Sequence, residues 1–112
     1  MDDSGRIQLP SKSHKWISIF GKEVFITTLD GKSVVIYPRL VWSDYRRELE
    51  RTGKRKYVKA FLRRANFYGL ITEMDSRGRI DIGQRLREKT GLEGRLIIEE
   101  EQDHVRVIKA DN

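Results

Sequence analysis

The sequence has no cysteine, two histidines and no apolar run close to the roughly 20 residues that a membrane-spanning helix needs. The lack of cysteine excludes disulfides, thiol chemistry and cysteine-based zinc sites. The first residues, 1–4, are acidic and polar, unlike a secretory signal peptide. These absences predict a soluble intracellular protein that has no cofactor, no membrane partner and no small-molecule substrate.

Motifs for catalysis are also missing. His14 and His104 lie far apart, and the chain contains no Ser-His-Asp arrangement, no phosphate-binding P-loop and no G-x-G-x-x-G. Asp2-Asp3 or the run 99–101 could in principle hold a metal. An exposed acidic strand edge explains them better, because metal sites need ligands that converge from several elements. We therefore expect neither an enzyme nor a metal site.

Positive charge is concentrated in the middle of the chain. The net charge is +6, and residues 31–74 carry eleven basic and four acidic groups, whereas 1–30 and 75–112 are close to neutral. A basic concentration attracts nucleic-acid phosphates through counterion release. The charge alone is equally consistent with a solvated helix surface.

The sequence contains an internal repeat. Residues 1–9, MDDSGRIQL, match residues 74–82, MDSRGRIDI, at an offset of 73. The similarity continues from 21–26 to 94–99 and, after a short insertion in the first copy, from 33–37 to 104–108. Matches in register over such a length indicate a duplicated structural unit.

Each copy predicts the same order of elements. Asp-x-x-Gly-Arg predicts a turn that leads into a strand, because glycine tolerates positive φ. A short helix follows, at 84–90 in the second copy, where Gly91 ends it and Leu92 folds back as an apolar contact. A hairpin comes last: strands 23–28 and 33–37 flank an Asp-Gly turn in the first copy, and 95–100 pairs with 105–109 in the second.

A helical segment joins the two copies. Ser43 is suited to cap a helix that runs to Leu49, and a second helix is predicted from Arg55 to Tyr68 by apolar residues at i, i+3, i+4 and i+7. Residues 70–74 then predict a strand that enters the second motif. The domain boundaries expected from this order are 1–41 for the first module, 42–68 for a helical connector packed on the modules, and 69–112 for the second module.

Two tandem Asp-x-x-x-Arg motifs, Asp2 to Arg6 and Asp75 to Arg79, resemble those of the MraZ proteins of the AbrB-like, swapped-hairpin superfamily. The run 86–92, LREKTGL, is similar to the family's Leu-Arg-Glu-x-x-Gly-Leu. Tyr37-Pro38 before a helix with Trp42, and a Phe-x-Arg-type helix at 61–64, are further family traits. The resemblance covers nearly the whole chain.

The resemblance implies a mainly β fold with short helices, in which two tandem swapped-hairpin modules form a pseudo-symmetric double-split β-barrel. It also implies a ring-shaped homo-oligomer that binds direct repeats in promoter DNA. Family members usually repress a division and cell-wall gene cluster, so the resemblance implies a bacterial cytoplasmic protein associated with the nucleoid. Assembly also suits a small polar chain, because oligomerisation buries surface that the monomer cannot.

The chain departs from the family pattern at three places. Members usually have a strand before the first Asp, whereas only Met1 precedes Asp2 here. The usual Ile-Pro after the second motif is Ile82-Gly83, whereas the first copy keeps Leu9-Pro10. The segment 11–16 also lacks the usual Phe-Arg helix. These departures affect the expected geometry of the first module more than that of the second.

The motif arginines are the main candidates for DNA contact. A guanidinium offers a planar fork of donors that matches guanine O6 and N7, or a phosphate. Pairing with the aspartate four residues earlier could instead only fix the turn, and the two roles can coexist. The expected DNA-binding residues are Arg6, Arg79, Arg77, Lys12 and Lys15, of which the two lysines are expected to contact phosphates. The residues expected to orient the motifs are Asp2, Gly5, Asp75 and Gly78.

Other features leave alternatives open. The basic run at 51–59 could reach DNA, could face an acidic strand of another subunit, or could be a solvated helix start, which is the preferred interpretation. Four aromatic residues are expected in the core or at subunit interfaces: Trp16, Trp42, Tyr45 and Phe67. An antitoxin-like or scaffolding module that binds protein is the alternative function, although two fused modules without a long tail argue against it. Fold alone does not decide between these functions.

Overall fold

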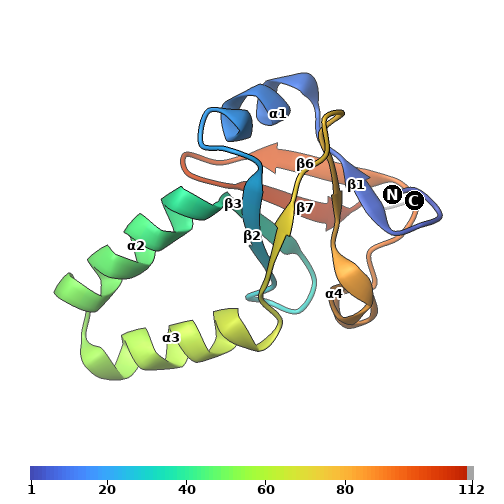
Figure 1. Ribbon diagram of the computed structural model, residues 1–112. Coiled ribbons are helices and arrows are strands. Elements are labelled where there is room, and N and C mark those ends of the chain that lie inside the picture. The colour runs from blue at the N-terminus through green and yellow to red at the C-terminus, as the bar shows by residue number, and fades with distance from the viewer. Residues whose placement is uncertain (111–112) are drawn as a thin grey trace.

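The computed structural model describes residues 1–110, which form four helices and seven strands (Figure 1). In chain order these are β1 (Arg6–Gln8), α1 (Ser11–Ser18), β2 (Glu23–Thr27), β3 (Val34–Pro38), α2 (Arg39–Thr52), α3 (Arg55–Phe67), β4 (Leu70–Glu73), β5 (Arg79–Asp81), α4 (Gly83–Thr90), β6 (Leu96–Glu100) and β7 (Val105–Lys109). The helices α2 and α3 have 14 and 13 residues. The expectation of a mainly β chain with short helices is therefore corrected to a mixed α/β fold.

Both sheets are antiparallel and combine strands from the two sequence copies. The larger sheet has the order β4-β2-β3-β7-β6, and β1 pairs with β5 in a separate two-stranded ribbon. Strand β4, which precedes the second motif, pairs with β2 of the first copy, and β3 pairs with β7. Neither copy holds a complete sheet. The boundaries at 41/42 and 68/69 stay a prediction.

The strand pairing has approximate two-fold symmetry. In the ribbon, Ile7 lies opposite Ile80, its own equivalent in the repeat. In the larger sheet, Val35 lies opposite Arg106, and these residues also occupy equivalent places in their hairpins. The duplicated sequence therefore folds around an axis that passes through both strand pairs.

The main core is built from both copies. Fourteen buried apolar residues form one cluster, to which the ribbon contributes Ile7 and Ile80, both fully buried. Alternation along β1 and β5 turns these isoleucines inward and the flanking polar residues outward. Leu92 also belongs to this cluster, as the sequence predicted for the residue after the helix stop at Gly91, whose φ is 70°.

The helices α2 and α3 form a hairpin that projects from the sheets on the side away from the N-terminus (Figure 1). Its base is held by a second cluster, in which Trp42 stacks on Phe25 of β2 with ring centroids 4.4 Å apart. Helix α2 begins at Arg39 after Pro38, so Ser43 lies inside the helix and the prediction that it caps the helix is wrong. Proline fixes φ and restricts the preceding residue, which makes it a stronger start signal than a serine further on.

Two further differences concern the helices. Residues 11–18 form α1 despite lacking the family's usual Phe-Arg sequence, since Ser13 and Ile17 provide its buried face. Helix α4 begins at Gly83, one residue earlier than predicted. None of the helices in residues 1–110 has the length and apolar character needed to cross a membrane.

The ribbon contact makes a testable contribution to stability. Replacing Ile80 by Ala removes a fully buried side chain from the main core. We expect this variant to lose about 2–5 kcal/mol of unfolding free energy, measured by urea denaturation. Ile19→Ala, at a side chain that is 77% exposed, is the control and should change little. Equal effects of the two substitutions would contradict a core role for the ribbon.

Candidate nucleic-acid interface

The first Asp-x-x-x-Arg motif is a closed turn built around the Asp2 carboxylate. Oxygen Oδ1 accepts hydrogen bonds from the backbone N–H groups of Ser4 at 3.0 Å and of Arg6 at 2.8 Å. Oxygen Oδ2 accepts a bond from Arg6 Nε at 3.0 Å. Gly5 donates its N–H to the Asp2 carbonyl at 3.1 Å and adopts a φ of 84°. One carboxylate therefore fixes both the turn and the arginine side chain that leaves it.

The second motif repeats this geometry. Asp75 Oδ1 accepts from the backbone N–H groups of Arg77 and Arg79, each at 2.9 Å. Asp75 Oδ2 accepts from Arg79 Nε at 2.8 Å, and Gly78 has a φ of 78°. Within residues 1–110, neither motif arginine has a protein acceptor for its terminal Nη atoms. Both guanidinium groups are thus held at Nε, with their outer donors available.

The turn hydrogen bonds favour the ionised carboxylates. The backbone N–H of Arg6 is the largest cause that lowers the pKa of Asp2, from 3.8 to about 2, and the Ser4 hydroxyl and the Arg6 charge act in the same direction. The backbone N–H of Arg79 is likewise the largest cause that lowers the pKa of Asp75. Both aspartates therefore carry full charge at neutral pH.

Each turn is covered by the helix of the other sequence copy. A Cβ atom added at Gly5 would lie 2.8 Å from the Arg87 side chain on α4, and one added at Gly78 would lie 2.8 Å from the His14 ring on α1. His14 and Arg87 are themselves equivalent at the repeat offset of 73. The glycines predicted to orient the motifs therefore meet two requirements, a positive φ and close packing against a helix.

The two motif arginines come together on the polar face of the ribbon. Arg6 lies opposite Asp81, and Gln8 lies opposite Arg79. The two arginines are thus diagonal neighbours, for which sheet geometry gives a separation of roughly 7–8 Å. Both line one surface depression of about 520 Å³, together with Asp2, Gln8 and residues of β6.

The other predicted contacts lie apart from this depression. Arg77 is exposed in the second turn, and its carbonyl accepts a hydrogen bond from Gln8 Nε2 at 2.7 Å. Lys12 and Lys15 are exposed on α1. Lys12 forms an ion pair with Glu100 at 3.5 Å, whereas Lys15 has no ion-pair partner in the described part of the chain.

Sequence reasoning did not single out three polar residues close to the motif arginines. Gln8 and Asp81 share the ribbon's polar face with them, and Arg95 lines the same depression. The signal for the first two was the alternation Arg6-Ile7-Gln8, which places Gln8 on the face of Arg6. Nothing local in the sequence points to Arg95.

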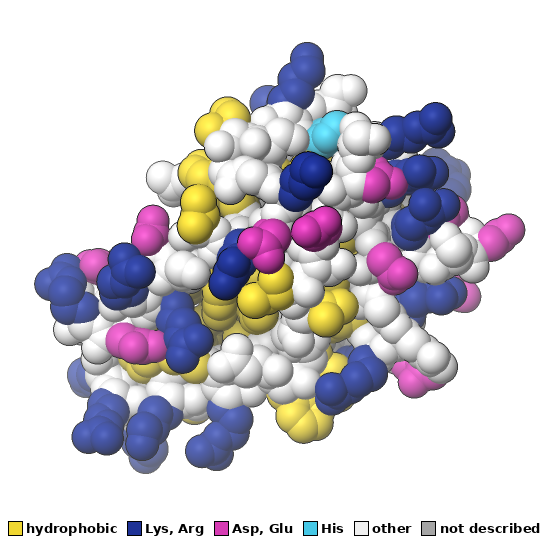
Figure 2. All heavy atoms as spheres, viewed as in Figure 1, with side chains coloured by type: hydrophobic (Ala, Val, Ile, Leu, Met, Phe, Trp, Pro, Cys, Tyr) yellow, Lys and Arg dark blue, Asp and Glu magenta, His cyan; other side chains and the backbone are white. Residues whose placement is uncertain are grey.

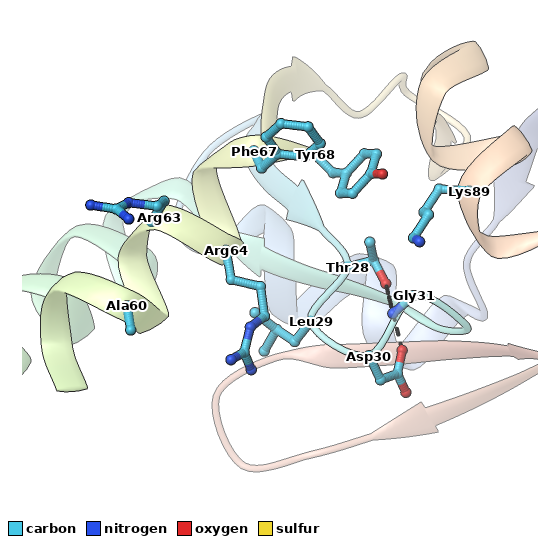
Figure 3. Close-up of a pocket in the computed structure, with 10 residues that line it drawn as sticks. All are labelled: Thr28, Leu29, Asp30, Gly31, Ala60, Arg63, Arg64, Phe67, Tyr68 and Lys89. Atoms are coloured by element: carbon cyan, nitrogen blue, oxygen red, sulfur yellow. Dashed lines mark hydrogen bonds between the residues drawn. The ribbon is translucent and has the colours of Figure 1, made fainter.

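A separate pocket of about 500 Å³ lies between α3, the β2–β3 turn and α4 (Figure 3). Arg64 and Lys89 line it from two helices, beside the ring of Tyr68. Phe67, expected in the core or an interface, is 61% exposed here and carries Arg85 over its ring at 5.3 Å, whereas Trp42 is buried as expected. No cluster of three or more His, Asp or Glu side chains within residues 1–110 is arranged to hold a metal.

The fold and the two turns define a tandem-repeat α/β protein in which each copy completes the other's sheets and carries one aspartate-held arginine. No protein-family model matches the chain. The chain is 34% identical over 109 residues to the transcriptional regulator MraZ of Acidobacterium capsulatum, which covers 96% of this chain and 75% of that protein. It is 27% identical to MraZ of Koribacter versatilis, over 88% of this chain and 69% of that protein. It is 29% identical to MraZ of Leuconostoc mesenteroides, over 100% of this chain and 77% of that protein.

The chain therefore belongs to the MraZ family of transcriptional regulators, as its two motifs predicted. Membership in a family of regulators confirms the expectation that the protein is not an enzyme.

The Asp2 carboxylate should make stability depend on pH. Because its folded-state pKa of about 2 lies below the ordinary 3.8, its contribution is present above about pH 4 and is lost as the pH falls toward 2. We expect the unfolding free energy of Asp2→Asn to fall less steeply over this range than that of the unchanged protein. Asp3→Asn is the control, since Asp3 accepts none of the hydrogen bonds of this turn. Identical slopes for the two variants would contradict the role of Asp2.

The packing at Gly78 can be separated from its backbone conformation. Gly91 also has a positive φ, of 70°, but a Cβ there would meet nothing within 4 Å. We expect Gly91→Ala to cost about 1–2 kcal/mol for the left-handed backbone alone, and Gly78→Ala to cost more. Adding His14→Ala should recover part of the loss in Gly78→Ala and none in Gly91→Ala, as measured by thermal denaturation. An absence of recovery would mean that His14 of α1 does not pack closely against Gly78.

Proposed function

We propose that the chain is a sequence-specific DNA-binding regulator that binds direct repeats in promoter DNA as a ring-shaped homo-oligomer. It acts in the bacterial cytoplasm, associated with the nucleoid, as a repressor of a division and cell-wall gene cluster. The observation that carries the proposal is the pair of aspartate-held arginines, Arg6 and Arg79, on one face of a two-stranded ribbon.

The geometry suits readout of base edges. A major groove about 12 Å wide admits a two-stranded β-ribbon, and an arginine that uses two donors recognises guanine O6 and N7. Arg6 and Arg79 use Nε within their turns and keep their Nη donors available. Because their side chains are already oriented, less conformational entropy is lost on binding.

The remaining predicted residues take supporting roles. Arg77 adds an exposed cation to the second turn, where the first turn has Ser4, so the two turns contact DNA differently. Lys12 and Lys15 contact phosphates from α1 and carry no sequence information. Asp2 and Asp75 orient the arginines, and Gly5 with Gly78 permits the turns.

The open edges of the larger sheet support self-association. Strands β4 and β6 lie at its two ends, so each has one side without a strand partner in residues 1–110. Leu70 and Ile71 on β4 are 43% and 51% exposed, and Ile97 on β6 is 45% exposed. Two different edges that associate head to tail generate a ring when the rotation closes.

Fluorescence anisotropy on duplexes with intact or scrambled direct repeats tests the DNA-reading role. We expect Arg79→Ala and Arg6→Ala each to reduce the preference for the intact repeats by about 1–3 kcal/mol, the usual value of one bidentate base contact. Lys12→Ala and Lys15→Ala should weaken binding to both duplexes alike.

Arg46→Ala is the matched control, because it removes one positive charge from an ion pair on α2. It should leave the preference unchanged. Binding without any preference for the repeats, or a preference indifferent to both motif arginines, would contradict base reading. An absence of DNA binding at low salt would instead favour the protein-binding alternative.

A further inference from the structure

The basic residues of the α2–α3 hairpin fall into two classes. On α2, each arginine has an acidic partner: Arg39 with Glu23, Arg46 with Glu50, Arg47 with Asp44, and Arg51 with Glu48. Helix α3 contains no acidic residue. Six exposed cations on α3 and just before it have no ion-pair partner in residues 1–110: Lys54, Arg55, Lys56, Lys59, Arg63 and Arg64. The excess positive charge of the hairpin therefore lies on α3.

Three of these cations form the centre of one helix face. Lys56, Lys59 and Arg63 follow i, i+3 and i+7, and so share a face. The buried residues Val58 and Ala65 lie on the opposite side of the helix. The three side chains span roughly 10 Å along the axis at 1.5 Å per residue. We call this surface the α3 cationic face.

The position of this face separates it from the motif arginines. The hairpin projects from the sheets on the side away from the N-terminus, and Lys and Arg side chains crowd its surface (Figures 1 and 2). Toward α4, positive charge continues past Arg64 to Lys89, whose Nζ lies 5.8 Å from the centroid of the Tyr68 ring (Figure 3). A duplex that contacted both surfaces would therefore present different phosphates to α3 and to the ribbon.

We propose that the α3 cationic face binds the phosphate backbone of the duplex and supplies affinity that does not depend on sequence. The inference rests on the DNA-binding function proposed above and adds a second contact to it. A row of unpaired cations matches a polyanion with regularly spaced charges. Protein interfaces, in contrast, exclude charge from their centres and are depleted in lysine. Between Lys56 and Arg63, the residues on this face are Lys59 and Ala60.

Two triple variants test the proposal by their salt dependence. Lys56→Gln/Lys59→Gln/Arg63→Gln removes three unpaired cations, and Arg46→Gln/Arg47→Gln/Arg51→Gln removes three ion-paired cations from the adjoining helix. Both lower the net charge equally. Anisotropy is measured from 50 to 200 mM salt on intact and scrambled repeats, and circular dichroism checks that each variant is folded.

For the α3 triple, we expect binding to weaken roughly ten- to hundredfold on both duplexes, with the slope of log K against log salt reduced by about 2–3. The preference for intact repeats should stay unchanged, unlike that of Arg79→Ala. The α2 triple should have a much smaller effect. The single variants Lys56→Gln and Lys59→Gln should each reduce the slope by about one, which keeps the test valid if the α3 triple does not fold.

The other outcomes overturn the proposal in distinguishable ways. Equal weakening by both triples would mean that net charge, and not this face, governs binding. Unchanged DNA binding by the α3 variants, with the unchanged protein still selecting the repeats, would leave the proposed function intact and assign α3 to an acidic protein surface. An absence of DNA binding by the unchanged protein would remove the proposed function and this contact together.

Discussion

The exchange of strands between the two sequence copies is the constraint on which the rest of the structure depends. The ribbon strands have three residues each and gain stability mainly by pairing with each other and burying Ile7 against Ile80 in the shared core. A strand pair of this length is marginal by itself. Because each copy supplies half of this antiparallel pair, the two motif turns lie at opposite ends of one short ribbon. The positions of both arginines thus follow from the duplication, and the helix of each copy closes over the turn of the other.

This arrangement explains how a half-buried arginine is held in place. Arginine loses much rotamer freedom when it is ordered, and an exposed ion pair alone is worth little. In each turn, however, the aspartate is itself fixed by backbone N–H donors, so its second oxygen offers Nε a stationary partner. The low pKa of Asp2 follows from the same donors, and it keeps the carboxylate charged at neutral pH. Each motif arginine can thus be fixed within its turn at Nε and still have donors available for DNA.

The sequence predicted local features well and long-range pairing poorly. The turn at Asp75, the stop at Gly91 and both hairpins depend on neighbouring residues, and the structure confirms them. The pairing of β4 with β2, in contrast, joins segments nearly fifty residues apart, and no local pattern encodes it. The prediction that Ser43 caps the helix is wrong because α2 begins at Arg39, directly after Pro38, and no capping side chain sets its start. Arg95 joined the candidate site only through tertiary contact, whereas the alternation of β1 already placed Gln8 beside Arg6 on one face.

The basic middle of the chain shows why composition alone could not separate a solvated surface from a binding surface. Spacing distinguishes the two helices: on α2, acids three or four residues from the arginines form pairs along the helix, and these pairs cancel most of its field. On α3, five basic residues share a helix that contains no acidic residue. Beyond a Debye length of about 8 Å, the fields of two opposite charges a few ångströms apart cancel, whereas the fields of like charges add. The two proposals together divide recognition between two elements: the turns would discriminate among base sequences, and the helix would supply attraction that every sequence shares. Salt would then change the total affinity without changing which site is preferred.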